Sequence, residues 1–216
     1  MVRLFYTEVK QSDRQTQARH LHDAAHEMLR RCVLSCMTGI TGKPALAVRL
    51  ELSYGEHGKP YLKSHPAFNV SLSHAGDIAM CAISEQEIGV DVQDHRAISD
   101  ERMISLAARF YAPEEQQFLE EAPSFDVRQE RFFRIWAAKE AYAKYTGKGL
   151  AEDFTRFYAD FEGMRIRESG NMNSNVFAYL CEPLSLDAYS CMLCSEEPVA
   201  RENGCITIRS DFVPRS

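Results

Sequence analysis

The stretch WAAKEAYAKYTGKGL, residues 136–150, decides how the rest of the chain is interpreted. It predicts the end of an amphipathic helix over residues 127–146, closed by the glycines that follow. Helical spacing places Trp136, Glu140 and Lys144 on one face, which begins with aromatic residues and should pack inward. A carboxylate at the edge of a core needs a cation or hydrogen bonds. Lys144, four residues after Glu140, can supply one partner, although the same spacing also fits an ordinary surface ion pair.

The segment IGVDVQ, residues 88–93, predicts a strand with aliphatic side chains on one side. Gly89, Asp91 and Gln93 share the other side, where the glycine allows another group to approach closely. An aspartate at this place fits either a solvated strand end or a functional site. Asp91 and Glu140 together could form a two-carboxylate site for Mg²⁺, which keeps waters and takes further ligands from phosphate oxygens.

Two further segments predict contacts to an anion. In FNVSLSHAGD, residues 68–77, Ser73 and His74 precede a glycine turn, and a hydroxyl, an imidazole and turn N–H groups together suit an anion. In GEHGKPYL, residues 55–62, Lys59 stands on a glycine-flanked turn where a phosphate could approach the backbone. Either segment alone is also compatible with an ordinary exposed turn.

Composition limits the classes of function. The chain has 216 residues, 45% of them hydrophobic, and a formal net charge of -6. The net charge argues against general nucleic-acid binding, which favours a basic face. No apolar run reaches the ~20 residues of a membrane span, and the polar N-terminal stretch is not typical of a signal peptide. We therefore expect a cytoplasmic protein without membrane segments, whose seven cysteines are reduced and mostly buried.

Periodicity predicts a mixed α/β (α+β) chain with a boundary in the polar stretch after residue 94. The two parts are an N-terminal α/β half, residues 1–95, and a C-terminal α/β half, residues 96–216. A weak echo between DIAMCAISE, from Asp77, and DAYSCMLCSE, from Asp187, hints that the halves are related. Helices are expected over residues 14–37, 101–110, 113–121 and 127–146. Strands are expected near residues 2–9, 46–54, 68–77, 78–84, 87–94, 155–162, 176–182, 187–194 and 204–209.

The four segments HGKPYL, FNVSLSHAGD, IGVDVQ and WAAKEAYAKYTGKGL, in this order, resemble the Sfp-type 4'-phosphopantetheinyl transferases. The resemblance covers roughly residues 55–155. It implies a pseudo-dimer of two similar α/β halves with coenzyme A and Mg²⁺, or Mn²⁺ in its place, in the cleft between them. It also implies transfer of the phosphopantetheine arm of coenzyme A to a serine of an apo acyl or peptidyl carrier protein, with release of 3',5'-ADP.

The resemblance also implies roles for individual residues. Asp91 and Glu140 become metal ligands, with Glu140 also the base for the carrier serine, and Lys144 steadies the leaving diphosphate. The residues implied to contact coenzyme A are Lys59, Pro60, Ser73, His74, Lys139 and Lys144, together with Arg14 and Arg19 as candidates for the nucleotide 3'-phosphate. For Lys139 a structural ion pair is the alternative.

One departure from the family pattern leaves the metal site open. The family often has an acid two residues after the strand aspartate, where this chain has Gln93. We expect an indirect or absent metal contact there and weaker Mg²⁺ binding. Gln93 supports one alternative to the transferase, a non-catalytic relative that binds coenzyme A or a carrier protein and regulates. A second alternative is a Mg²⁺-dependent phosphodiesterase, which would use the same carboxylates but water instead of a serine.

Other patterns carry less weight. Cys191 and Cys194 form a CxxC, but within a strand their side chains point to opposite faces and predict core cysteines rather than zinc ligands. We expect the carrier protein to dock on an apolar patch with local basic residues, near Arg109, Phe110 and Tyr111. Because a pseudo-dimer needs no partner subunit, a monomer is expected.

Overall fold

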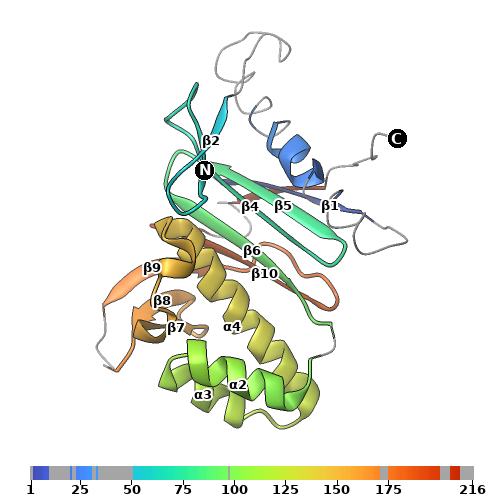
Figure 1. Ribbon diagram of the computed structural model, residues 1–216, viewed down its shortest axis with the longest axis vertical. Coiled ribbons are helices and arrows are strands. Elements are labelled where there is room, and N and C mark those ends of the chain that lie inside the picture. Colours follow the sequence, from blue (N-terminus) through green and yellow to red (C-terminus); the bar gives the residue numbers. More distant parts are fainter. Residues whose placement is uncertain are drawn as a thin grey trace.

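Two β-sheets form the centre of the molecule (Figure 1). The computed structural model describes residues 2–9, 20, 23–30, 33, 51–96, 98–170 and 175–199, with residues 150 and 205–209 described by their backbone alone. The strands of the first sheet are β1 (Val2–Glu8), β2 (Leu52–Tyr54), β3 (Pro60–Leu62), β4 (Asn69–Ala75), β5 (Ile78–Ser84) and β11 (Cys205–Arg209). Those of the second are β6 (Ile88–Asp94), β7 (Phe157–Asp160), β8 (Arg165–Glu168), β9 (Val176–Cys181) and β10 (Tyr189–Ser195).

The strand order is β11-β1-β5-β4-β3-β2 in the first sheet and β6-β10-β9-β8-β7 in the second. Neighbouring strands run antiparallel except β1 and β11, which are parallel. Strand β6 is therefore an edge strand of its sheet, and its outer edge lies beside β4 of the other sheet. This edge becomes one wall of the candidate site.

The layers follow from the alternation of apolar side chains. One face of β1 and β5 packs against the face of β6 that carries Ile88, Val90 and Val92, so the two sheets share a core. The other face of the first sheet packs against helical residues 23–30 and 33. The other face of the second sheet is covered by the long helix α4 (Phe125–Thr146), so the order of layers is helix, sheet, sheet, helix.

The helices begin and end where the sequence provides caps. The helices around α4 are α2 (Asp100–Phe110), α3 (Pro113–Glu120) and the short 3-10 turns η2 (Gly149–Ala151) and η3 (Phe154–Arg156). Ser124 accepts a hydrogen bond from the Val127 backbone N–H at the start of α4, and Gly147 ends it with a φ of 73°, in the left-handed region that favours glycine. The predicted glycine stop of this helix is confirmed.

Most predicted elements are confirmed, including the α+β fold class with its two related sheets. The echo from Asp77 and Asp187 falls on β5 and β10, each an interior strand of its own sheet. The sequence missed β8, whose RIRE stretch is mostly polar, and it treated residues 60–62 as part of a turn although they form β3. Of the predicted helix over residues 14–37, the described part is helical and buries Ala25, Met28 and Leu29.

The sheets also show how the two halves are joined. β6 precedes residue 95 but pairs with β10, and β11 comes from the C-terminal half but pairs with β1. Each half thus gives one strand to the sheet of the other, while the boundary at residue 95 stays a prediction. Within the described part of the chain, no helix combines the length and apolarity that crossing a bilayer requires.

Candidate active site

A cavity of about 570 Å³ lies between the first sheet and the C-terminal half of α4. It is lined by the residues that the sequence predicted as site residues in four separate segments. They are Lys59, Pro60, Ser73, His74, Asp91, Gln93, Glu140 and Lys144. The fold therefore brings together the loop before β3, strand β4, strand β6 and helix α4 at one place.

Gly89 explains how α4 comes so close to β6. A Cβ atom at Gly89 would overlap the backbone carbonyl oxygen of Ala141 and lie 2.5 Å from the backbone nitrogen of Tyr145. The close approach that the sequence predicted at this glycine is thus made by the helix itself. Because the helix axis lies against β6, Glu140 and the following turn of α4 reach the face of the strand that carries Asp91.

Asp91 is the most connected acid of the cavity, and it is almost fully buried. Its Oδ1 lies 2.7 Å from the Lys144 ammonium and accepts a hydrogen bond from the Ser73 hydroxyl at 2.8 Å. Its Oδ2 accepts from the Gln93 amide nitrogen at 2.6 Å. Gln93 therefore orients the Asp91 carboxylate through this hydrogen bond. Such a contact agrees with an indirect role of Gln93 at a metal. Lys144 pairs with Asp91 on the neighbouring strand, whereas the sequence paired it with Glu140.

Two serines of β4 satisfy the free edge of β6. The backbone N–H of Val90 donates to the Ser71 hydroxyl at 2.9 Å, and that of Val92 donates to the Ser73 hydroxyl at 3.2 Å. Among the described strands, none pairs with β6 on this side, and leaving its N–H groups buried without an acceptor would be costly. Ser73 therefore has two partners, the edge of β6 and Asp91. The sequence identified Ser73 as a ligand contact but did not identify Ser71 at all.

Glu140 is half-buried, and none of the residues that the structure describes gives its carboxylate a hydrogen bond or ion pair within contact distance. Burial, and then the charge of Asp91, raise the pKa of Glu140, while Lys144 acts in the opposite direction. Two acids that disfavour each other's charge and face one cavity are a setting that a hard cation would stabilise. In the described residues, no group of three or more His, Cys, Asp or Glu side chains is arranged to hold a metal. The two carboxylates fit a hard cation such as Mg²⁺, which proteins often hold by one or two carboxylates.

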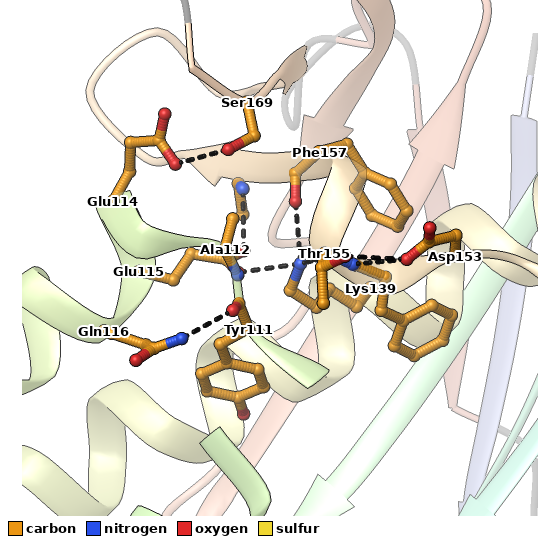
Figure 2. Close-up of polar contacts among 12 residues, drawn as sticks. Tyr111, Ala112, Glu114, Glu115, Gln116, Lys139, Asp153, Thr155, Phe157 and Ser169 are labelled. Atoms are coloured by element: carbon orange, nitrogen blue, oxygen red, sulfur yellow. Dashed lines mark hydrogen bonds and ion pairs between the residues drawn. The ribbon is translucent and has the colours of Figure 1, made fainter. Parts of the chain in front are cut away.

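Lys139 does not line the cavity, and here the structure supports the structural ion pair over a ligand contact. Its ammonium is completely buried, lies 2.7 Å from Glu115 Oε2, and donates to the carbonyl oxygens of Phe154 and Phe157 at 2.6 and 2.8 Å (Figure 2). Adjacent positions on a helix are about 100° apart, so Lys139 and Glu140 serve different sides of α4. All three donors of Lys139 are used by the protein.

Several predictions fall elsewhere. Arg14 and Arg19 lie outside the described residues, so their contact with a 3'-phosphate stays a prediction. The expected docking patch cannot include Tyr111, because its ring is buried and its hydroxyl donates to the Phe132 carbonyl oxygen at 2.7 Å. Cys191 and Cys194 are buried in the cores on opposite faces of the second sheet, as predicted.

The cavity also has an aromatic and imidazole side, of which the sequence did not identify Tyr54 and His57. Tyr54, on β2, is 54% exposed, and its hydroxyl lies 3.3 Å from Nε2 of His26. His57, from the loop before β3, lines the same side. The sequence offered little indication of a role for Tyr54, because β2 is an edge strand of only three residues. Its contact with the helical residues 23–30 depends on the tertiary fold.

Comparison with known proteins gives a consistent result. The model of the 4'-phosphopantetheinyl transferase superfamily matches residues 87–194. The 4'-phosphopantetheinyl transferase psf-1 of Bacillus pumilus is 32% identical over 153 residues, which are 68% of this chain and 61% of that protein. HetI of Nostoc sp. is 39% identical over 110 residues, 48% of this chain and 44% of HetI. Sfp of Bacillus subtilis is 29% identical over 124 residues, 57% of this chain and 51% of Sfp. The chain thus spans about half the length of these curated relatives.

Proposed function

This chain belongs to the 4'-phosphopantetheinyl transferase superfamily, and we propose that it transfers the 4'-phosphopantetheine arm of coenzyme A to a serine of an apo acyl or peptidyl carrier protein. The other product is 3',5'-ADP. The observation that carries the proposal is the meeting of Asp91, Glu140 and Lys144 in one cavity that is also lined by Lys59. This set offers both carboxylates for a cation and ammonium groups for a diphosphate.

Asp91 and Glu140 are the residues that would hold Mg²⁺, with Mn²⁺ as a substitute. The ion, when bound, neutralises the diphosphate of coenzyme A and favours displacement at its phosphorus. Gln93 supports this site through its hydrogen bond to Asp91 Oδ2, which orients that carboxylate. We propose no direct bond from Gln93 to the ion.

The chain's own residues account for the movement of charge. In the reaction, the carrier serine oxygen forms a bond to the phosphorus that bears the pantetheine arm, and the bond from that phosphorus to the bridging diphosphate oxygen breaks. Glu140 accepts the serine proton, directly or through a water. Lys144, held by Asp91 at the same site, stabilises the negative charge that develops on the leaving phosphate.

Binding of coenzyme A is assigned to the first-sheet side of the cavity. Lys59, Pro60 and His74 line it, and we propose that they contact phosphate or nucleotide groups of coenzyme A. Ser73 contributes to this binding indirectly, by orienting Asp91, because its hydroxyl donates its hydrogen to Asp91 Oδ1. Arg14 and Arg19 are proposed for the 3'-phosphate.

The test is intact-mass spectrometry of an apo carrier protein incubated with this protein, coenzyme A and Mg²⁺. Glu140→Gln and an EDTA sample should abolish the gain of one phosphopantetheine. Glu130→Gln is the matched control, because it makes the same change on α4 away from the cavity and should keep activity.

Two other outcomes identify the alternatives. Coenzyme A that binds without modification of acyl and peptidyl carriers alike would favour the regulatory relative. Breakdown of coenzyme A without a modified carrier would favour the phosphodiesterase. The cytoplasmic location and the monomeric state remain predictions, the second of which light scattering in solution would test.

A further inference from the structure

Lys59 extends from the loop before β3 to the end of α4. Its ammonium lies 2.7 Å from the backbone carbonyl oxygen of Tyr145, in the last turn of the helix, and 2.5 Å from Oε2 of Glu87. Its stem lies against Gly147, where a Cβ atom would be 3.1 Å from Lys59 Cδ. Lys59 is therefore bound to protein groups on both sides while it lines the cavity.

The two acceptors differ in what they do to the charge of Lys59. The Tyr145 carbonyl carries a partial charge at the negative end of a helix, which attracts a cation and fixes its place. Glu87 carries a full charge and neutralises the ammonium. A lysine has three N–H donors, and the described residues provide acceptors for two of those of Lys59.

Glu87 is placed so that it can leave Lys59. It stands in the turn between β5 and β6, directly before Ile88, and its side chain is 53% exposed, against 20% for Lys59. An ion pair with one partner this exposed contributes little to stability and is exchanged readily for another anion. A phosphate group with two negative charges is a stronger partner for the same ammonium.

We propose that Glu87 competes with a phosphate of coenzyme A for Lys59 and so sets the affinity of the cavity for that ligand. This inference rests on the proposed function. When coenzyme A binds, the Glu87 carboxylate turns to solvent, and the contact of Lys59 with the Tyr145 carbonyl stays. Glu87 thus influences the affinity for coenzyme A only through its ion pair with Lys59, and it does not contact the reacting atoms.

The test is isothermal titration of coenzyme A in the presence of Mg²⁺, at low and at high salt. Glu87→Gln should lower the Kd for coenzyme A by about 3- to 10-fold at low salt, and less at high salt. In turnover with a carrier protein, KM for coenzyme A should fall by a similar factor while kcat is unchanged. Glu85→Gln is the matched control, because it removes the same charge from the same exposed turn, two residues away.

A double-variant cycle separates the specific contact from a general change of charge. In a Lys59→Met background, Glu87→Gln should give no gain beyond that of Glu85→Gln. An equal gain from Glu85→Gln and Glu87→Gln, or weaker binding by Glu87→Gln, would overturn the inference and leave the proposed function standing. If the unaltered protein fails to bind coenzyme A at all, both proposals are wrong.

Discussion

The ammonium of Lys139 and the carboxylate of Glu115 lie 2.7 Å apart, and both are closed off from solvent between α3, α4 and β7 (Figure 2). Glu115 also accepts the backbone N–H groups of Ala112 and Ala159, at 2.9 and 3.0 Å. The pair therefore ties α3 and β7 to α4, the helix that carries Glu140. The contribution of this ion pair to the stability of the fold can be measured separately from the activity of the cavity.

Lys139→Met should destabilise the fold by about 3–5 kcal/mol, because it leaves the Glu115 charge buried without its cation. The measurement is urea unfolding followed by the fluorescence of Trp136, the single tryptophan, whose ring packs beside those of Tyr111 and Phe132. The double variant Lys139→Met with Glu115→Gln removes both charges and should be more stable than Lys139→Met alone. A double variant that loses the sum of the two single losses would show that the pair is not coupled.

Ser71→Ala and Ser73→Ala each remove an acceptor from a buried N–H group of β6, so each should cost about 1–3 kcal/mol of stability. Only Ser73 also donates to Asp91. Ser73→Ala should therefore weaken Mg²⁺-dependent binding of coenzyme A several-fold, while Ser71→Ala leaves it nearly unchanged. Equal binding by both variants in a titration at one temperature would contradict a role for Ser73 beyond the sheet edge.

Gly89→Ala should displace α4 from β6, because the added methyl group meets the Ala141 carbonyl and the Tyr145 nitrogen. Such overpacking against backbone costs about 1–3 kcal/mol or more, and it moves Glu140 away from Asp91. We expect a lower melting temperature together with a large loss of transferase activity. Gly55→Ala is the control: its nearest neighbour, the Lys59 carbonyl oxygen, is 3.7 Å away, so both properties should be kept.

Gln93→Glu adds a third carboxylate beside Asp91, so it should destabilise the protein without metal and strengthen Mg²⁺ binding. The Mg²⁺ concentration for half-maximal activity should fall by about 3- to 10-fold, since affinity for a hard cation follows the number of charged ligands. The Mg²⁺-dependent rise in melting temperature should increase as well. Gln86→Glu makes the same change in the exposed β5–β6 turn and should alter neither quantity. An unchanged Mg²⁺ requirement in Gln93→Glu would place residue 93 too far from the ion to matter.

The sequence predicted the elements whose signals are local. The end of α4 follows from its glycine cap, and the two faces of β6 follow from alternation. Lys139 could not be assigned in this way, because its partner Glu115 is 24 positions earlier and nothing in the helix pattern shows that the two meet. The role of Ser71 was equally hidden, since it depends on β6 being an edge strand that lies beside β4. Tyr54 and His26 share a cavity wall only through the tertiary arrangement.

The serine hydroxyls on the edge of β6 have a consequence for the pairing of this strand with other chains. An edge strand with free N–H groups can add a strand from another chain, and the apolar IGVDV stretch would favour such pairing. Ser71 and Ser73 occupy those donors within the same molecule. During folding they can do so only after β4 has reached β6, so the interval before that step is when chains of this protein are most exposed to aggregation.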